Sequence, residues 1–136
     1  MDAPHLSTDG HEPCRVLIVK DNPDSSAILA RTVQSNGFEF ETARNGTEAL
    51  MLAASFRPHV AIVDIGLPGL DGLYVARELR KAIGDLLIIA ATGRAAPEDV
   101  ESSRDAGFDY HLIKPLNLAM LATILMEWKS RGGCAA

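Results

Sequence analysis

Five short segments rich in apolar residues alternate along the chain with longer segments of helical pattern. The short segments are predicted strands, at 15–19, 38–43, 60–63, 86–91 and 110–113. The first and third are continuously apolar, as expected of strands that are covered on both faces. The last helical segment carries apolar side chains three and four residues apart, which predicts one buried face. These side chains are Leu118, Leu121, Leu125 and Trp128.

Capping and turn residues mark the ends of several predicted helices. Asn22 is an expected N-cap with Pro23 at the first helical position, and Gly37 ends that helix. A short polar helix is expected to begin at Pro97 and to end at Gly107. Five strands alternating with five helices predict an α/β fold, in which one parallel sheet lies between two helical layers.

Composition limits the classes of function. The chain has 136 residues, of which 47% are hydrophobic and 23% are charged, so one folded domain is expected. Its net charge of −5 argues against nucleic-acid binding, and it has no apolar run of the roughly 20 residues that a membrane span needs. We expect a flexible leader over 1–13, a folded domain over 14–130 and a short tail over 131–136.

The two cysteines are Cys14 and Cys134, and their spacing matches neither a disulfide framework nor a metal-binding motif. Cys14 opens an apolar run and is interpreted as a small buried hydrophobic residue. Residues 1–13 lack the apolar stretch of a signal peptide. Together these features predict a protein of the reducing cytoplasm.

Charged and hydroxyl-bearing residues follow four of the predicted strands, at the edge of the sheet where α/β proteins bind ligands. They are Lys20 and Asp21, Asp64, Thr92, and Lys114. An acid after a strand is, by itself, more often a helix N-cap or a turn former. Two acids, two lysines and a hydroxyl at one edge are much harder to obtain by accident, and they predict a functional site.

Four segments that include these residues resemble the signatures of receiver domains of bacterial two-component systems, in the same order and at the same spacing. The segments are 16–24, 63–72, 91–93 and 113–115. The resemblance implies a flavodoxin-like (βα)5 fold, a doubly wound five-stranded parallel sheet with strand order 2-1-3-4-5. It also implies a signalling domain rather than an enzyme, with at most catalysis of its own phosphorylation and dephosphorylation.

The resemblance implies a role for each residue at the strand ends. Asp64 would accept a phosphoryl group from a phosphohistidine on a histidine kinase or a histidine phosphotransfer protein. Mg²⁺ would be held by Asp21, Asp64 and the backbone carbonyl of Gly66. Thr92 would donate a hydrogen bond to a phosphoryl oxygen. Lys114, which in this family is often joined to the following proline by a cis peptide bond, would form an ion pair with the same group.

Lys20 departs from the family pattern, which has two adjacent acids after the first strand. Its ammonium removes one oxygen ligand and adds a positive charge where the ion would bind. Two unit charges roughly 4 Å apart repel by about 4 kcal/mol at an effective dielectric constant of roughly 20, and a divalent ion would feel about twice that. In one interpretation Lys20 substitutes in part for the metal by neutralising Asp21 and Asp64. In the other it extends into solvent and leaves a weakened site.

An output surface is implied on the fourth helix, the fifth strand and the fifth helix. Its candidate contacts are His111, Met120 and Ile124, with packing in the core as the alternative interpretation of Met120 and Ile124. His111 occupies the position of an aromatic residue that in this family reports the state of Thr92, and a surface-facing strand residue is the alternative interpretation. The surface would bind a downstream protein or a second copy of the chain. His59, which precedes the third strand, is expected to face solvent.

Three functions compete. The first is a phosphoryl-accepting receiver, either stand-alone or part of a hybrid kinase, and the second is a pseudo-receiver that binds partners without phosphorylation because Lys20 disrupts the Mg²⁺ site. The third, a flavin-binding protein or an enzyme on the same fold, is the weakest, since the loop at 21–25 has no glycine-rich phosphate-binding sequence. No helix-turn-helix is expected after the last helix, so we expect the output to pass through a partner protein.

Overall fold

The computed structural model describes residues 14–65, 72–92 and 107–134. The elements in these ranges are β1 (Cys14–Val19), α1 (Pro23–Ser35), β2 (Phe38–Ala43), α2 (Gly46–Phe56), β3 (Val60–Asp64), α3 (Gly72–Ala82), β4 (Leu87–Thr92), β5 (Tyr110–Ile113) and α5 (Leu118–Ser130). Each strand begins and ends within one residue of a predicted segment. The polar helix expected to begin at Pro97 falls outside the described residues.

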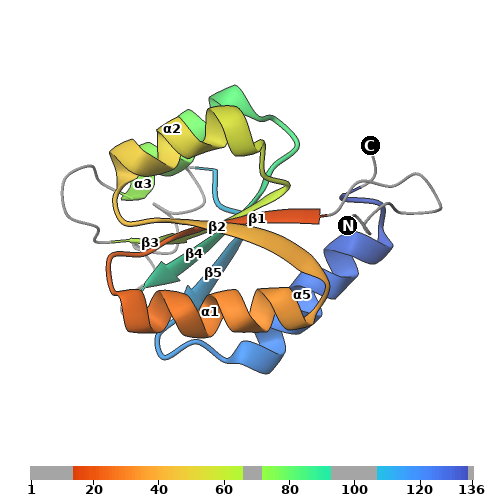
Figure 1. Ribbon diagram of the computed structural model, residues 1–136. Helices are drawn as coiled ribbons and strands as arrows, with labels where there is room; N and C mark the ends of the chain where they lie inside the picture. The colour runs from red at the N-terminus through yellow and green to blue at the C-terminus, as the bar shows by residue number, and fades with distance from the viewer. Residues whose placement is uncertain (1–13, 66–71, 93–106, 135–136) are drawn as a thin grey trace, which may run out of the picture.

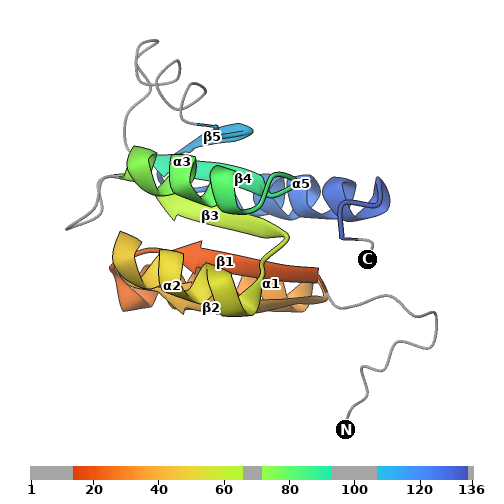
Figure 2. The same ribbon diagram turned by 90° about the horizontal axis from the view of Figure 1, so that it is seen from above.

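The five strands form one sheet in the order β2-β1-β3-β4-β5, and neighbouring strands are parallel throughout. Figures 1 and 2 show α1 and α5 on one face of the sheet and α2 and α3 on the other. The predicted strand order and the doubly wound α/β architecture are therefore confirmed. None of the helices in the described ranges is long and apolar enough to cross a bilayer.

Both faces of the central strands are buried. Ile18 and Ile62 belong to one core cluster, which α1 and α5 complete, whereas Leu17 and Val63 belong to a second cluster under α2 and α3. Because successive side chains of a strand point to opposite faces, a strand covered on both sides is apolar at every position. This arrangement explains why the segments that form β1 and β3 are continuously apolar.

The strand register brings the carboxyl ends of four strands to one edge of the sheet. Val19 of β1 pairs with Val63 of β3, and Thr92 of β4 pairs with Ile113 of β5. One residue further on, the backbone N–H of Lys114 donates to the carbonyl of Thr92 at 2.7 Å. Residues that follow these strands are therefore neighbours in space, although they are far apart in the sequence.

A disulfide joins Cys14, at the start of β1, to Cys134, which follows α5. Cys14 is buried as expected, but it is paired with Cys134, a disulfide that the spacing of the two cysteines did not indicate. They are 120 positions apart in the sequence, and they meet because α5 runs back along the sheet to the end where β1 begins (Figure 1). Residues 131–134, the described part of the segment expected to be a short tail, are consequently attached to β1 through Cys134.

His59 lies at the same end of the sheet, and the expectation that it faces solvent is wrong. It is half-buried, and its Nδ1 accepts a hydrogen bond from the backbone N–H of Arg15 at 3.0 Å. The pairing of β1 with β3 begins only at Val16 and Val60, so the N–H of Arg15 lies just before the paired part of these strands. The imidazole supplies an acceptor for this N–H, which holds the ring against the sheet.

α3 packs directly on the backbone that follows β3. A Cβ atom at Gly72, the first residue of α3, would lie 3.0 Å from the carbonyl oxygen of Asp64 and 3.0 Å from Cα of Ile65. Backbone atoms cannot move aside as the tip of a side chain can, so this close approach depends on glycine. Gly72 thereby fixes the strand end that carries Asp64.

We predict that Gly72→Ala lowers the free energy of unfolding by about 1–3 kcal/mol, because the added methyl group must displace backbone. Gly84→Ala is the matched control, since no atom lies within 4 Å of a Cβ built at that position, and it should change stability by less than about 0.5 kcal/mol. Urea unfolding followed by circular dichroism measures both. A Gly72→Ala variant as stable as Gly84→Ala would contradict the direct packing of α3 on β3.

Candidate functional site

The carboxylate of Asp64 lies between two lysine ammonium groups. Asp64 is the last residue of β3 and is 6% exposed. Its Oδ2 accepts a hydrogen bond from Nζ of Lys20 at 3.3 Å, and its Oδ1 lies 2.6 Å from Nζ of Lys114. Each carboxylate oxygen is thus paired with its own cation.

Lys20 is a buried member of this group. It follows β1 directly, its backbone N–H donates to the carbonyl of Ala43 at 3.0 Å, and the residue is 7% exposed. Burying an ammonium without a partner costs several kcal/mol, so the carboxylate of Asp64 is what allows Lys20 to remain inside the fold. The interpretation in which Lys20 extends into solvent is wrong for this structure.

Lys114 meets Asp64 from the other side and is partly accessible, with 38% of its side chain exposed. A cis peptide bond joins Lys114 to Pro115, as the resemblance implies. Oδ1 of Asp64 accepts no aligned hydrogen bond from a described residue, so its contact with Lys114 is chiefly electrostatic. Both oxygens of Asp64 are therefore in contact with an ammonium group, Oδ2 with a buried one and Oδ1 with a partly exposed one.

Two further residues of the expected site differ in exposure. Thr92 ends β4 and is 4% exposed, and it lies one residue beyond Ala91, the strand partner of Asp64. Asp21, which follows Lys20, is exposed. Gly66, whose carbonyl was the expected third ligand, lies outside the described residues. The structure thus brings Lys20, Asp64 and Lys114 into contact, with Thr92 on the neighbouring strand.

The described residues form a poor set of ligands for Mg²⁺. Only Asp64 and Asp21 contribute carboxylates among the expected ligands, and Asp64 is already paired with two ammonium groups. Mg²⁺ needs near-octahedral coordination by oxygen atoms at about 2.0–2.1 Å. The ammonium of Lys20, which lies 3.3 Å from Oδ2 of Asp64, supplies no oxygen and takes up space beside that carboxylate. The donor set fits a buried ammonium better than a divalent ion.

The residues expected on the output surface have different surroundings. Met120 on α5 is 51% exposed, whereas Ile124 is 7% exposed and packs in the core. Of the two interpretations of Ile124, packing in the core is the one that the structure supports, because Ile124 lies on the buried face of α5. His111 is half-buried, and neither of its ring nitrogens has a hydrogen-bond partner among the described residues. His111 is therefore not a surface-facing strand residue.

Ile113 is a surface residue that the sequence pattern did not identify. It is the last residue of β5 and is 50% exposed. β5 is an edge strand, and Leu112 is the one residue within it that is buried. The signal that identifies Ile113 is its position at the end of the last strand, next to Lys114.

Comparison with known proteins shows what the chain is similar to. The family model for the response regulator receiver domain matches residues 16–126. The chain is 40% identical over 109 residues to the response regulator MprA of Mycolicibacterium vanbaalenii, a match that covers 80% of this chain and 47% of the relative. It is 37% identical over 122 residues to the transcriptional regulatory protein PrrA of Mycobacterium leprae, with 90% and 52% covered.

Solved structures share the fold. A CheY-like response regulator receiver domain protein from Methanospirillum hungatei matches with a TM-score of 0.82 at 27% identity, covering 88% of this chain and 96% of that one. The chemotaxis protein CheY4 of Vibrio cholerae matches with a TM-score of 0.80 at 29% identity, covering 85% and 98%. The chain spans about half the length of the curated relatives it matches.

We predict that Asp64→Asn lowers the free energy of unfolding at neutral pH by about 2–4 kcal/mol, because it leaves the buried ammonium of Lys20 without its carboxylate. Adding Lys20→Met should recover at least about half of that loss, since the double variant buries neither charge. Lys114→Met in the Asp64→Asn background is the matched control, and it should recover less because Lys114 is 38% exposed.

Urea unfolding of the three variants and the wild type measures this coupling. Equal stability of Asp64→Asn and of the double variant with Lys20→Met would contradict the dependence of Lys20 on Asp64.

Proposed function

The chain belongs to the response regulator receiver family, and we propose that Asp64 is the residue on which it accepts a phosphoryl group from a histidine kinase or a histidine phosphotransfer protein. The observation that carries this proposal is the position of Asp64 at the end of the central strand, between the ammonium groups of Lys20 and Lys114. A carboxylate is a suitable nucleophile for phosphorus, and flanking cations stabilise the charge of the phosphorylated product.

In the proposed step an oxygen of the Asp64 carboxylate attacks the phosphorus of a phosphohistidine. An O–P bond forms, the P–N bond breaks, and the donor imidazole leaves with the electron pair and takes up a proton. We assign the attack to Oδ1, because its partner Lys114 is 38% exposed and can turn toward solvent, whereas Oδ2 is held by the buried Lys20. Lys114, which covers Oδ1, then pairs with the phosphoryl oxygens, and the hydroxyl of Thr92 donates to one of them.

Receiver domains generally bind Mg²⁺ for phosphorylation. In this chain we infer that Lys20 supplies part of that positive charge and that Mg²⁺ binds weakly or not at all. The supporting observation is the buried position of the ammonium, 3.3 Å from Oδ2 of Asp64. Repulsion between this cation and a divalent ion amounts to several kcal/mol, so the proposed transfer is routed through the two lysines and not through a metal.

A second function is favoured by the same ion pairs. Both oxygens of Asp64 are already matched by a cation, and a carboxylate held in this way is a weaker nucleophile than a free one. In that case the chain is a pseudo-receiver, an interaction module that binds partners without phosphorylation. The two functions differ in one observable, which is whether Asp64 becomes phosphorylated.

Response regulators interact with histidine kinases and with downstream targets. We infer that this chain meets its downstream protein through β5 and α5, where the apolar side chains of Ile113 and Met120 are exposed. A homodimer through the same surface is the alternative use. A net charge of −5 gives no reason to propose direct nucleic-acid binding by this chain, and we place the phosphotransfer in the cytoplasm.

Intact-mass spectrometry after incubation with phosphoramidate tests the proposal. We expect the wild type to gain one phosphoryl group at a rate that Mg²⁺ changes by less than about threefold, and Asp64→Asn to gain none. Lys20→Asp restores an acid pair and should make the rate depend on Mg²⁺ by at least about tenfold. Lys20→Met is the matched control, since it removes the charge without adding a ligand, and it should react slowly under both conditions.

Three results would change the assignment. An unmodified wild type beside a modified Lys20→Asp variant would overturn phosphoryl transfer to the native chain and support the pseudo-receiver. A wild type modified only with Mg²⁺ would keep Asp64 as the acceptor but overturn the role assigned to Lys20. Modification of Asp64→Asn would overturn the choice of acceptor.

A further inference from the structure

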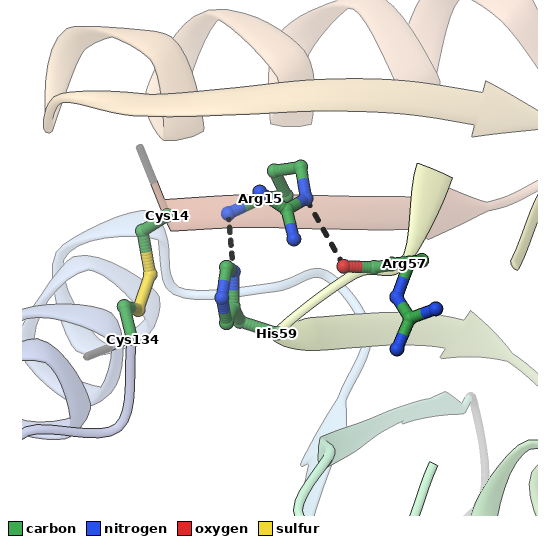
Figure 3. Close-up of a disulfide and its surroundings, with 5 residues drawn as sticks. All are labelled: Cys14, Arg15, Arg57, His59 and Cys134. Carbon is green, nitrogen blue, oxygen red and sulfur yellow. Dashed lines mark hydrogen bonds between the residues drawn. A yellow bond between two sulfur atoms is a disulfide. The ribbon is translucent and has the colours of Figure 1, made fainter. Parts of the chain in front are cut away.

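The disulfide between Cys14 and Cys134 lies at the opposite end of β1 from the phosphorylation site. The Cα atoms are 5.2 Å apart, and the residues are 2% and 6% exposed. Figure 3 shows the sulfur atoms beside the imidazole of His59, and a ring nitrogen of His59 lies within 4.8 Å of both sulfurs. Two cysteines and a histidine from three separate segments therefore form one cluster.

A backbone turn after α5 places Cys134 in this cluster. The N–H of Gly133 donates to the carbonyl of Trp128 at 2.9 Å, and the N–H of Gly132 donates to that of Lys129 at 3.1 Å. These are the two bonds of a Schellman turn, with Gly132 at φ +82° in the left-handed position. A Cβ at Gly133 would overlap the indole of Trp128, so the chain passes flat over that ring.

His59 is poorly suited to hold a metal ion in this cluster. Its Nδ1 accepts a hydrogen bond from the backbone N–H of Arg15 at 3.0 Å, so in the neutral ring the proton is on Nε2. The lone pair of Nδ1 is then used by this hydrogen bond, and Nε2 has none with which to bind a metal ion. Binding a metal would break that hydrogen bond and take this acceptor from the N–H of Arg15. A ring nitrogen of His59 lies within 4.8 Å of both sulfurs, and an N–H donor beside a reduced cysteine favours the thiolate form.

We expect the rest of the fold to persist without the disulfide. Two core clusters on either side of the five-stranded sheet hold the described residues together, and the disulfide joins only the first residue of β1 to the turn after α5. Opening it would release the turn at 131–134 and leave the sheet intact. A disulfide in a reducing compartment, which is the location proposed above, is usually transient or redox-sensing rather than structural.

We propose that Cys14 and Cys134 are a redox modification site, which exchanges with low-molecular-weight disulfides and whose oxidation fastens the end of α5 to β1. The thiolate of Cys134 attacks one sulfur of the small disulfide, whose S–S bond breaks with departure of a thiolate. The thiolate of Cys14 then attacks the sulfur of Cys134 in the mixed disulfide and expels the second small thiolate. The two protons lost by the cysteines are taken up by the two small thiols, and the protein is oxidised by two electrons.

This site gives the domain a second input on the helix that carries the proposed docking surface. Met120, on the first turn of α5, is exposed for a partner, while the last turn of α5 is fixed by the disulfide and by Lys129, whose Nζ lies 5.4 Å from the centre of the Phe38 ring. Oxidation therefore restrains α5 at the end opposite Met120. The proposal does not involve Asp64, so its outcome is independent of phosphotransfer.

The experiment is a titration of the full chain with mixtures of reduced and oxidised glutathione, followed by alkylation with N-ethylmaleimide and intact-mass spectrometry. We expect a reversible change between two alkylated cysteines and none, whereas Cys14→Ser and Cys134→Ser should instead carry one glutathione. His59→Asn keeps an acceptor for the N–H of Arg15 but lacks Nε2, and it should slow oxidation by at least about threefold without changing the thermal stability of the reduced protein.

Amide hydrogen exchange on the reduced and oxidised chain measures the restraint on α5. Reduction should speed exchange at Arg131, Gly132 and Gly133 by at least about tenfold and leave the amides of β3 unchanged. Loss of protection across the whole sheet on reduction would overturn the proposal in favour of a structural disulfide. Cysteines that stay reduced at every glutathione ratio would overturn it, and so would tight binding of one Zn²⁺ by the reduced chain that Cys14→Ser abolishes.

Discussion

The salt bridge between Lys20 and Asp64 is the interaction on which the functional edge of this domain depends. A buried ammonium and a buried carboxylate are each unfavourable alone, and each makes the other acceptable inside the fold. The register of β1 with β3 places them side by side, and Gly72 lets α3 pack onto the backbone of Asp64. The sheet therefore presents a carboxylate whose charge is already balanced by protein groups before any ligand arrives.

This arrangement changes how a receiver site works. An acidic pocket with several carboxylates attracts a divalent ion, and its charge is balanced only when the ion is bound. Here the ammonium groups of Lys20 and Lys114 balance the charge of Asp64 without an ion. Both proposed functions, a phosphotransfer that depends little on Mg²⁺ and a pseudo-receiver that is not phosphorylated, rest on the buried position of Lys20.

Much of the fold could be predicted from the sequence, because the buried strands are continuously apolar and the strand-end residues recur in a known order. The face to which Lys20 turns could not be predicted, since a flexible side chain of four methylene groups reaches either solvent or Asp64. The sequence left core packing and partner contact both open for Ile124, because apolar spacing on α5 does not by itself distinguish the face toward the sheet from the face beside it. The disulfide was missed because Cys14 and Cys134 meet only through the path of α5 across the whole sheet.

β1 connects the two sites of this domain. It begins with Cys14, which is joined to the segment after α5, and it leads at its other end into Lys20, which is joined to β3 through Asp64. Both ends of β1 are thus fixed by side-chain contacts, a disulfide at its first residue and a salt bridge just after its last. The exposed side chains of Ile113 and Met120 lie on β5 and α5, the elements of the proposed docking surface.

The most direct test of the central claim is a Mg²⁺ titration followed by the amide NMR signals of Asp21 and Asp64 in the wild type and in Lys20→Asp. If the ammonium of Lys20 occupies the place of the ion, the wild-type signals will not shift to saturation at millimolar Mg²⁺, whereas those of Lys20→Asp will. Saturating shifts of equal midpoint in the two proteins would show that Lys20 does not exclude the ion, and would contradict its role as a built-in substitute for the metal.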